Sequence, residues 1–521
     1  MKKLITIILC LTVFGLINAC KKLELTPEDY FGSGNFWKNT AQVDGAMVGL
    51  HAQLRSFQFT LFTLGELRSG IFKDATGATG TSSLNSGALI RQDIRESSPG
   101  ITSWAGLYAP IFQVNNFIYQ VNQADFLTAA DKNYYLAQAY GLRAFYYFHL
   151  YRTFGRVPLA TEPKVLTNTP STSADAYLAR TKTEKETFDF IKADIDKSVS
   201  NFNGSFTAKG LNAQWSLGAS LMLKAEVYLW SAKVKIDGQL PANVAADLST
   251  ARTAVESVIP NFTLQGSFAD VFKYANKGNK EIIFSLRYSQ GEATNNFGQF
   301  IYAITDPMTS FTDVNGSSLT GDPLQVAGGG TIIRYEYKFD VFARYENADT
   351  RGRATFFDFY KAPASTNKFV NLRKFLGTIT DNARSFSDDV PVYRLAEAYL
   401  ILAEIKNKQG IDPSTEINLL RKRAYGTAAF TAFTGGTFEQ NELAIFEERG
   451  KEFVAEGKRW YDLRRMQDAS GDPLVFRKDL PLVGVLDKTT ESYKLLWPID
   501  RATLTADELL KNDQNPGYSG T

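Results

Sequence analysis

Three glutamates spaced four residues apart are the clearest candidates for chemistry in this 521-residue sequence. Glu448, Glu452 and Glu456 fall within the segment 438–467, whose pattern predicts a helix, and that spacing would place all three carboxylates on one helix face. Paired carboxylates can serve as the acid and base of a glycoside hydrolase. Four arginines accompany them in the sequence: Arg449, Arg459, Arg464 and Arg465. Nearby positive charge lowers a carboxyl pKa, whereas a general acid needs a raised one. The cluster therefore favours a structural salt-bridge network between helices.

Nucleophilic and metal chemistry have few residues to draw on. The chain has two histidines, His51 and His149, and both fall in segments with helical periodicity and aromatic neighbours. No carboxylate stands at the spacing of a metal site beside either of them. The sequence also lacks GxSxG, HExxH and P-loop motifs, and a GxGxxG at a strand–helix junction. We therefore predict packing roles for both histidines, no metal, no cofactor and no enzyme activity.

Three charged residues interrupt otherwise apolar helical faces. They are Arg143, Arg394 and Glu404. A buried charge without a partner costs several kcal/mol, so each needs an opposite charge. We predict that they join neighbouring helices and do not contact a ligand.

Helical periodicity dominates the chain and predicts a mainly α fold. The segments with this pattern are 36–56, 103–124, 136–151, 183–201, 213–233, 244–258, 392–403, 412–425 and 438–467. Small residues recur where helices would pack closely: Ala137, Ala139, Ala144, Ala396, Ala398 and Ala403. Neighbouring helix pairs rich in small and aromatic residues are typical of tetratricopeptide-like stacking.

Two stretches have a different, loop-like composition. Residues 260–390 are rich in Gly, Asn, Ser and Thr, with strand-like runs at 281–288 and 331–339. Residues 73–100 form the second stretch, and within it Thr76 to Gly87 is nearly all small or polar. Long irregular segments in a compact domain are commonly functional loops. For Thr76 to Gly87, a functional loop and a disordered segment remain equal alternatives.

The start of the chain has the order of a secretory leader. Lys2 and Lys3 precede an apolar run from Leu4 to Ile17, and Ala19 then precedes Cys20. The run has about 14 residues, fewer than the roughly 20 that a membrane-spanning helix needs. An aliphatic residue three positions before a cysteine is typical of a bacterial lipobox, which predicts that Cys20 carries acyl chains such as palmitate. Several chains together would hold the protein durably at a membrane.

Composition excludes other classes of protein. Cys10 is the only other cysteine and lies within the leader, so the mature chain has neither a disulfide nor a free thiol. Removal of Lys2 and Lys3 with the leader lowers the formal charge from +2 to zero. A neutral chain has no electrostatic footprint for nucleic acid.

Six motifs, in order along the chain, resemble the SusD/RagB family of surface lipoproteins. Near the start are Leu23-Glu24-Leu25-Thr26-Pro27 and Asn35-Phe36-Trp37-Lys38, followed by Trp104, Tyr108, Ile111, Asn115 and Ile118. The others are Arg143 to Phe148 with the exit Phe154 to Leu159, Pro391 to Glu397 with Ala403-Glu404, Glu448 to Arg465, and Trp497-Pro498-Ile499 with Gln514 to Tyr518. The match covers nearly the whole mature sequence.

The resemblance implies a tetratricopeptide-like superhelix of four helix pairs, with a variable loop-rich part that holds the ligand site. It also implies a lipid-anchored position on the outer face of the outer membrane and a SusC-like TonB-dependent transporter as partner. The expected divisions are 1–19 (signal peptide), 20–35 (tether), 36–260 (N-terminal helical region), 261–390 (variable ligand-binding region) and 391–521 (C-terminal helical region).

Ligand contacts are expected in the two variable stretches, because sugars stack on aromatic rings and bond to amides and charged groups. The candidates are Phe72, Asp74, Asn85 and Arg91 in the early loop, and Asn295, Asn296, Phe297, Phe300 and Tyr302 in the later one. All six tryptophans fall in scaffold patterns, which leaves none in the loops as a stacking platform.

We therefore predict a cell-surface protein that captures oligo- or polysaccharide and delivers it to a transporter without cleaving it. Three alternatives stay open. The ligand could be a peptide, which the missing loop tryptophan favours. The protein could be a glycoside hydrolase that uses the Glu448 cluster, or a purely structural lid on its transporter.

Overall fold

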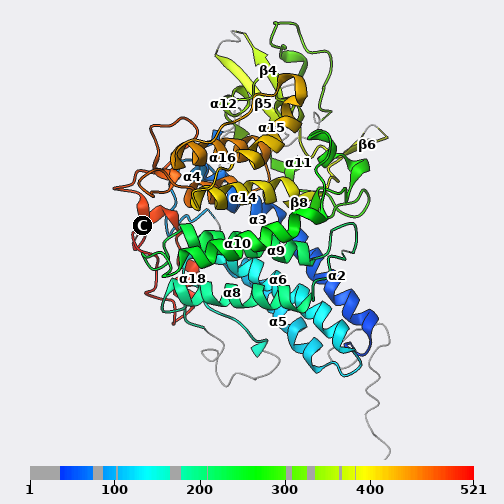
Figure 1. Cartoon of the computed structure of the whole chain (residues 1–521), viewed down its shortest axis with the longest axis vertical. Coiled ribbons are helices and arrows are strands. Elements are labelled where there is room, and N and C mark those ends of the chain that lie inside the picture. Colours follow the sequence, from blue (N-terminus) through cyan, green and yellow to red (C-terminus); the bar gives the residue numbers. More distant parts are fainter. Residues whose placement is uncertain are drawn as a thin grey trace, which may run out of the picture.

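The computed structural model describes residues 36–73, 86–100, 104–164, 178–207, 209–300, 308–325, 335–362, 366–381 and 383–520. Stacked helices form the larger part of this structure, and short strands and loops lie above them (Figure 1). The prediction of a mainly α, tetratricopeptide-like fold is confirmed.

The long N-terminal helices pack against one another in chain order. They are α2 (Thr40–Ser56), α5 (Ala105–Gln123), α6 (Ala129–Phe154), α8 (Glu184–Asn201), α9 (Leu217–Lys233) and α10 (Val244–Val258). Helix α5 packs on α6, α6 on α8, α8 on α9, and α9 on α10. This succession of neighbouring helices is the stacking that the small and aromatic residues predict.

The C-terminal helices return to the same stack. They are α14 (Leu395–Lys408), α15 (Ser414–Ala429), α16 (Phe438–Glu452), α17 (Arg459–Arg465) and α18 (Arg501–Ala506). Helix α14 packs against α10, α15 and α16, so it joins the two halves of the scaffold. Shorter helices are α3 (Gln58–Phe62), the π-helix η1 (Thr63–Leu67), α4 (Ser86–Ile90), α11 (Phe297–Phe300), α12 (Phe339–Ala343) and α13 (Thr350–Thr355).

Polar residues before the first turn fix where several helices begin. The side chains of Thr128, Thr183 and Ser216 accept hydrogen bonds from backbone N–H groups of α6, α8 and α9. Thr437 and Gln440 form a reciprocal capping box at the start of α16. Such caps satisfy N–H groups that have no partner inside the helix, at about 1 kcal/mol each.

Close helix packing depends on the small residues. The six alanines named above are all fully buried. Gly141 on α6 faces Trp215, and a Cβ atom at this position would lie 2.1 Å from the indole Nε1. Only glycine allows this approach, because real Cβ atoms do not come so near another heavy atom.

Among the described residues, four two-stranded antiparallel sheets form within and around the loop-rich part. The pairs are β1 (Phe72–Lys73) with β3 (Glu336–Tyr337), β2 (Ile282–Leu286) with β8 (Val390–Arg394), β4 (Phe356–Lys361) with β5 (Asn367–Leu372), and β6 (Thr378–Thr380) with β7 (Ala383–Ser385). The β4–β5 hairpin lies at the upper end of Figure 1, and α2 and α5 reach the lower end. Two of these sheets join distant parts of the chain, which holds the loop-rich part to the scaffold.

Two predicted helices have different limits in the structure. The segment 438–467 is not one helix, because α16 ends at Glu452 and α17 begins at Arg459. Between them Ala455 and Gly457 have positive φ values of 64° and 69°, and their N–H groups donate to the buried Glu66 carboxylate at 2.8 and 2.9 Å. The segment 392–403 begins as strand β8, because Val390 and Pro391 pair with β2.

The predicted helix-joining role is confirmed for Arg143 and Glu404, whereas Arg394 lies at the end of strand β8 and pairs there with Glu281, Glu452 and Glu456. Arg143 on α6 donates to Asp194 on α8 at 2.6 Å. Glu404 on α14 accepts from Lys233 on α9 at 2.8 Å and from Arg465 on α17 at 2.9 Å. Each pair joins two helices at a position that excludes water.

Candidate functional site

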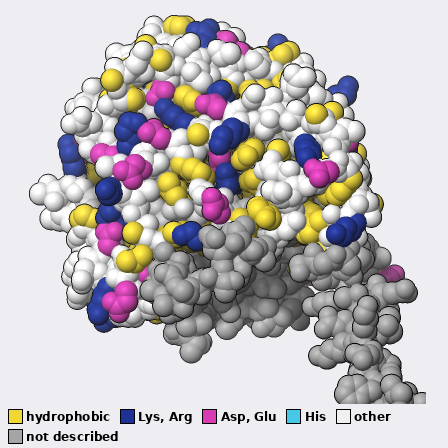
Figure 2. Space-filling model, turned by 90° about the horizontal axis from the view of Figure 1, so that it is seen from below, with side chains coloured by type: hydrophobic (Ala, Val, Ile, Leu, Met, Phe, Trp, Pro, Cys, Tyr) yellow, Lys and Arg dark blue, Asp and Glu magenta, His cyan; other side chains and the backbone are white. Residues whose placement is uncertain are grey.

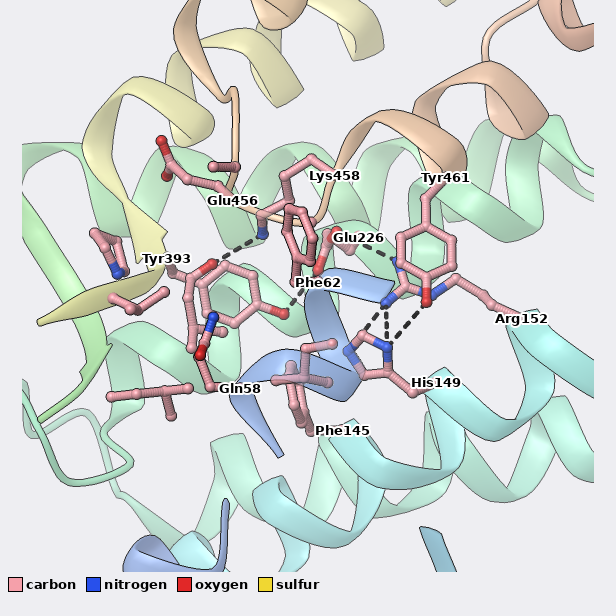
Figure 3. Close-up of a pocket in the computed structure, with 17 residues that line it drawn as sticks. Gln58, Phe62, Phe145, His149, Arg152, Glu226, Tyr393, Glu456, Lys458 and Tyr461 are labelled. Carbon is pink, nitrogen blue, oxygen red and sulfur yellow. Dashed lines mark hydrogen bonds and ion pairs between the residues drawn. The ribbon is translucent and has the colours of Figure 1, made fainter. Parts of the chain in front are cut away.

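An internal cavity lies where the N- and C-terminal parts of the scaffold meet (Figure 3). Its volume is about 50 Å³. Helix α3 supplies Gln58 and Phe62, α6 supplies His149 and Arg152, and α9 supplies Glu226. The remaining polar side chains come from the C-terminal part: Tyr393, Glu456, Lys458 and Tyr461.

The polar groups around this cavity bond to one another. Glu226 accepts a hydrogen bond of 2.7 Å from the Tyr393 hydroxyl, and its carboxylate lies 3.7 Å from Arg152. The Nδ1 atom of His149 lies 3.2 Å from the Tyr461 hydroxyl. Figure 3 shows these contacts crossing the cavity from one wall to the other.

Neither the size nor the electrostatics of this cavity suits a ligand or an acid–base reaction. Pockets for small molecules have volumes of about 300 to 1,000 Å³, whereas 50 Å³ holds only a few water molecules. Burial, with the positive charges of Arg152 and Lys458, holds the pKa of His149 well below its ordinary value. Burial alone would raise the pKa of Glu226, but Lys458 and Arg152 outweigh it and lower the pKa. The cavity is a polar part of the core.

The glutamate cluster forms the buried ion network that its neighbouring arginines predict. Glu452 lies 3.1 Å from Arg351 and 2.7 Å from Arg394, and it also pairs with Arg423. Burial alone would raise the pKa of Glu452, but the three arginines hold it well below its usual range. A carboxyl in this state cannot donate a proton as a general acid. Glu456 lies in the turn after α16 and not on the face of a helix, because α16 ends at Glu452.

The early-loop candidates fall in different places. Phe72 is 1 % exposed and its ring centroid lies 4.4 Å from that of Tyr337, so this ring packs in the core. Arg91 is exposed. Asp74 and Asn85 lie outside the described residues, as does Cys20 with the expected leader and tether.

The later candidates are mostly internal. Phe297 is fully buried and stacks on Phe375 at 5.1 Å. Asn295 is buried and donates to the Asp388 carbonyl at 3.3 Å, and the Asn296 N–H donates to Gln58 at 3.2 Å. The rings of Phe72 and Phe297 therefore offer no face to a ligand, because both are covered by other aromatic rings. The Phe300 side chain and Tyr302 lie outside the described residues.

A row of aromatic rings on the β4–β5 hairpin was not predicted. Phe359 stacks on Phe357 at 6.3 Å and on Phe369 at 5.4 Å, with interplanar angles of 20° and 14°. Phe311 lies edge-on to Phe359 at 4.9 Å. Phe359 and Phe311 are buried, whereas Phe357 and Phe369 are half-buried and reach solvent. We call these four rings the hairpin aromatic face.

Polar groups border the hairpin aromatic face. The Lys73 Nζ atom lies 5.4 Å from the Phe369 ring centroid, and Lys361 lies 5.7 Å from that of Phe311. Asn371 pairs in register with Phe357, is 3 % exposed, and its Nδ2 atom has no hydrogen-bond partner among the described residues. Aromatic rings that reach solvent beside two ammonium groups are groups that can recognise a hydroxylated ligand.

This face adjoins both variable stretches that the sequence singled out. Lys73 is the first residue of the early stretch, and the hairpin lies within the later one together with Met308, which packs on Phe311 and Phe359. The sequence did carry a signal for the hairpin. Residues 356–361 are all aromatic or charged, and Pro363 follows them at a spacing that favours a turn before a second strand.

The outer surface mixes both signs of charge. Figure 2 shows Lys and Arg side chains interspersed with Asp and Glu over the lower face. Within the described ranges, no helix is long and apolar enough to span a bilayer.

Known proteins are similar to this chain in sequence and in architecture. The family model described as "SusD family" matches residues 360–518, and the one described as "Starch-binding associating with outer membrane" matches residues 58–209. The starch-binding protein SusD of Bacteroides thetaiotaomicron is 23% identical over 415 residues, which is 68% of this chain and 68% of that protein.

Two solved structures are similar over almost their whole length. A SusD superfamily protein from Bacteroides fragilis is 39% identical, with a TM-score of 0.83, and the match covers 93% of this chain and 100% of that one. B. fragilis NanU is 33% identical, with a TM-score of 0.79, and the match covers 94% and 99% of the two chains. With such identity over nearly all of both chains, and with the matching helical scaffold, this chain belongs to the SusD/RagB family.

Proposed function

We propose that this protein captures oligo- or polysaccharide at the cell surface, on the hairpin aromatic face, and passes it to a SusC-like TonB-dependent transporter without cleaving it. Family membership supports glycan binding, since relatives include a starch-binding protein and a laminarin-binding one. The observation that carries the choice of site is the pair of half-buried rings, Phe357 and Phe369, which reach solvent on the β4–β5 hairpin.

The proposed location follows from the leader and the lipobox. Acyl chains on Cys20 would hold the protein at the outer membrane, and residues 20–35 would serve as the tether. The described chain starts next to α2, near the lower end of Figure 1, and the β4–β5 hairpin lies at the upper end. Such an arrangement places the hairpin aromatic face far from the start of the scaffold. Large molecules can therefore reach this face.

A binding role without catalysis agrees with the charge network. The glutamates that could flank a glycosidic bond are enclosed in the core, and Glu452 and Glu456 have lowered pKa values because of Arg423, Arg394 and Lys374. A glycoside hydrolase needs a carboxylic acid with a raised pKa near its substrate. Capture followed by transport needs no such acid.

The proposal is tested with protein that lacks residues 1–20, screened on a glycan array and then titrated with the best glycan by calorimetry. The double variant Phe357→Ala/Phe369→Ala should weaken that affinity by about 10-fold or more, since truncating a ring at the centre of a binding site costs roughly 1 to 2 kcal/mol. Phe126→Ala is the matched control, because Phe126 is 41% exposed and lies between α5 and α6, far from the hairpin.

Three outcomes would contradict the proposal. Unchanged glycan affinity in the double variant would exclude the hairpin aromatic face. Binding of peptide pools without any glycan would establish the peptide alternative. Release of reducing sugar by the wild type, abolished by Glu452→Gln, would establish a hydrolase.

A further inference from the structure

A second, larger cavity lies on the other side of the scaffold from the hairpin. Its volume is about 300 Å³, and it opens between the ends of α6, α8, α9 and α17 and the C-terminal segment 492–516. The C-terminal segment is drawn in red on the left of Figure 1. We call this cavity the Arg464 pocket and define it by six of its lining residues: Tyr151, Glu184, Trp230, Lys235, Arg464 and Tyr493.

Arg464 is a buried cation without a carboxylate partner. Its side chain is 7 % exposed, and its Nη1 atom donates to the backbone carbonyl of Arg152. Among the described residues no carboxylate lies within ion-pairing distance of it, whereas Arg465, the next residue, pairs with Glu404 at 2.9 Å. Burial lowers the pKa of Arg464 to about 10, so the guanidinium is still charged at neutral pH. A buried charge normally has a partner, and this pocket is the space that a partner could occupy.

The indole of Trp230 forms one wall of the pocket. Trp230 is 1 % exposed, and its Nε1–H faces the Tyr151 hydroxyl. The Trp230 ring lies 5.3 Å from the Arg464 guanidinium. The cavity is therefore lined by aromatic rings and by a guanidinium that lacks a carboxylate partner.

The walls and the charge of the pocket limit what fits. Tyr151, Trp230 and the half-buried Tyr493 provide aromatic surface, and a volume of 300 Å³ is at the lower limit for a small-molecule site. Arg464 and the exposed Lys235 carry two positive charges, and Glu184 carries one negative charge, which leaves a net charge of +1. The N-terminus of α8 is already used, because Asp237 accepts from the Glu184 N–H at 2.8 Å. This balance suits a monoanion better than a phosphate dianion, which Glu184 would repel.

We propose that the Arg464 pocket binds a small organic monoanion, a carboxylate carried on a ring of about the size of one sugar. The carboxylate would accept from the edge of the Arg464 guanidinium that does not bond to the Arg152 carbonyl, and the ring would pack against Tyr493. Planar bidentate recognition of a carboxylate is the geometry that arginine favours. This site is separate from the hairpin aromatic face and does not depend on glycan capture there.

The experiment compares two probes that differ only at one carbon. Glucuronate carries a carboxylate where glucose carries a hydroxymethyl group, so titrating both by calorimetry at equal ionic strength isolates the anion. We expect saturable binding of glucuronate and binding of glucose at least about tenfold weaker, since glucose lacks the charged acceptor for the Arg464 guanidinium.

Two variants and one control identify the pocket. Arg464→Gln should weaken glucuronate binding at least about tenfold, with folding checked by circular dichroism. Lys235→Glu changes an exposed residue, cannot disturb the core, and should weaken binding several-fold because it reverses the net charge. The matched control is Lys422→Glu, an exposed lysine on α15, which should leave binding unchanged.

Either of two results would overturn this proposal. Glucuronate could give no saturable signal, or no more than glucose. Alternatively, its affinity could stay the same in Lys235→Glu and in every folded preparation of Arg464→Gln. Lys235→Glu decides the question alone if the arginine variant does not fold. Neither result bears on Phe357 and Phe369, so failure here is distinguishable from failure of the proposed glycan site.

Discussion

His51 should make the stability of this protein depend on pH between about 4 and 6.5. Its Nδ1 atom lies 2.8 Å from the Met47 carbonyl, and its Nε2 atom accepts a 2.8 Å hydrogen bond from the Trp215 backbone N–H. This arrangement requires a neutral ring with its proton on Nδ1. A second proton on Nε2 would face the Trp215 N–H, so two donors would meet in a buried position. Burial therefore lowers the pKa of His51 from 6.5 to about 4.

The sign of the effect follows from where protons bind. Between pH 4 and 6.5 the unfolded chain binds a proton at His51 and the folded chain does not, so the free energy of unfolding falls as the pH falls. At 1.36 kcal/mol per pKa unit, a shift from 6.5 to about 4 corresponds to about 3 kcal/mol at full protonation of the unfolded state. Between pH 7.5 and 5 the loss is about 2 kcal/mol.

The measurement is urea unfolding at pH 7.5 and pH 5 for the wild type and for His51→Gln, whose amide oxygen can still accept from Trp215. Glu66 acts in the opposite direction, because burial raises its pKa to about 7, so the decisive quantity is the difference between the two proteins. The variant should lose about 2 kcal/mol less than the wild type on acidification. His149→Gln should also reduce the pH dependence, because burial and the neighbouring positive charges lower the pKa of His149 as well. Equal pH dependence in the wild type and in His51→Gln would refute the reasoning.

Three further substitutions test the packing of the scaffold. Gly141→Ala should lower the free energy of unfolding by about 1 to 3 kcal/mol, because its Cβ would meet Trp215, and thermal unfolding would show this. Asp194→Ala leaves Arg143 buried without its partner and should cost about 3 to 5 kcal/mol in urea unfolding, whereas an unchanged midpoint would exclude a role for the pair. Glu452→Gln should destabilise the protein by several kcal/mol, because it removes a charge from the buried network. The wild type and this variant should release the same amount of reducing sugar, whereas in a glycoside hydrolase the variant would lose this activity.

The scaffold was predictable because its signals are local. The spacing of apolar residues and the small residues at the contacts agree with one another, and most helix limits lie within a few residues of those predicted. The roles of Arg143, Arg394 and Glu404 were also predictable, since a charge inside an apolar face must find a partner. Where sequence reasoning failed, a distant residue decided the local structure. The break between α16 and α17 depends on Glu66, which is 389 positions from Ala455 along the chain.

The candidate site was less predictable for a similar reason. Composition located the loop-rich stretches but could not tell which of their aromatic rings other rings cover. Phe72 and Phe297 are covered by Tyr337 and Phe375. The rings that reach solvent lie on the β4–β5 hairpin, and the pairing of its two strands must be known before these rings can be placed side by side. Burial of a loop aromatic depends on tertiary contacts, and neither residue type nor spacing encodes them.

The position of the buried ion network indicates why so many charges are kept in the core. Replacing a buried ion pair with apolar residues is often neutral or stabilising, so stability alone does not account for it. Arg351 binds Glu448 at 2.6 Å and lies in α13, whose last residue, Thr355, immediately precedes strand β4. Arg394 ends strand β8 and binds Glu452 at 2.7 Å. Directional ion pairs fix orientation, whereas apolar contacts permit sliding. We therefore expect the network to fix the angle at which the loop-rich part, with the hairpin aromatic face, leaves the helical scaffold.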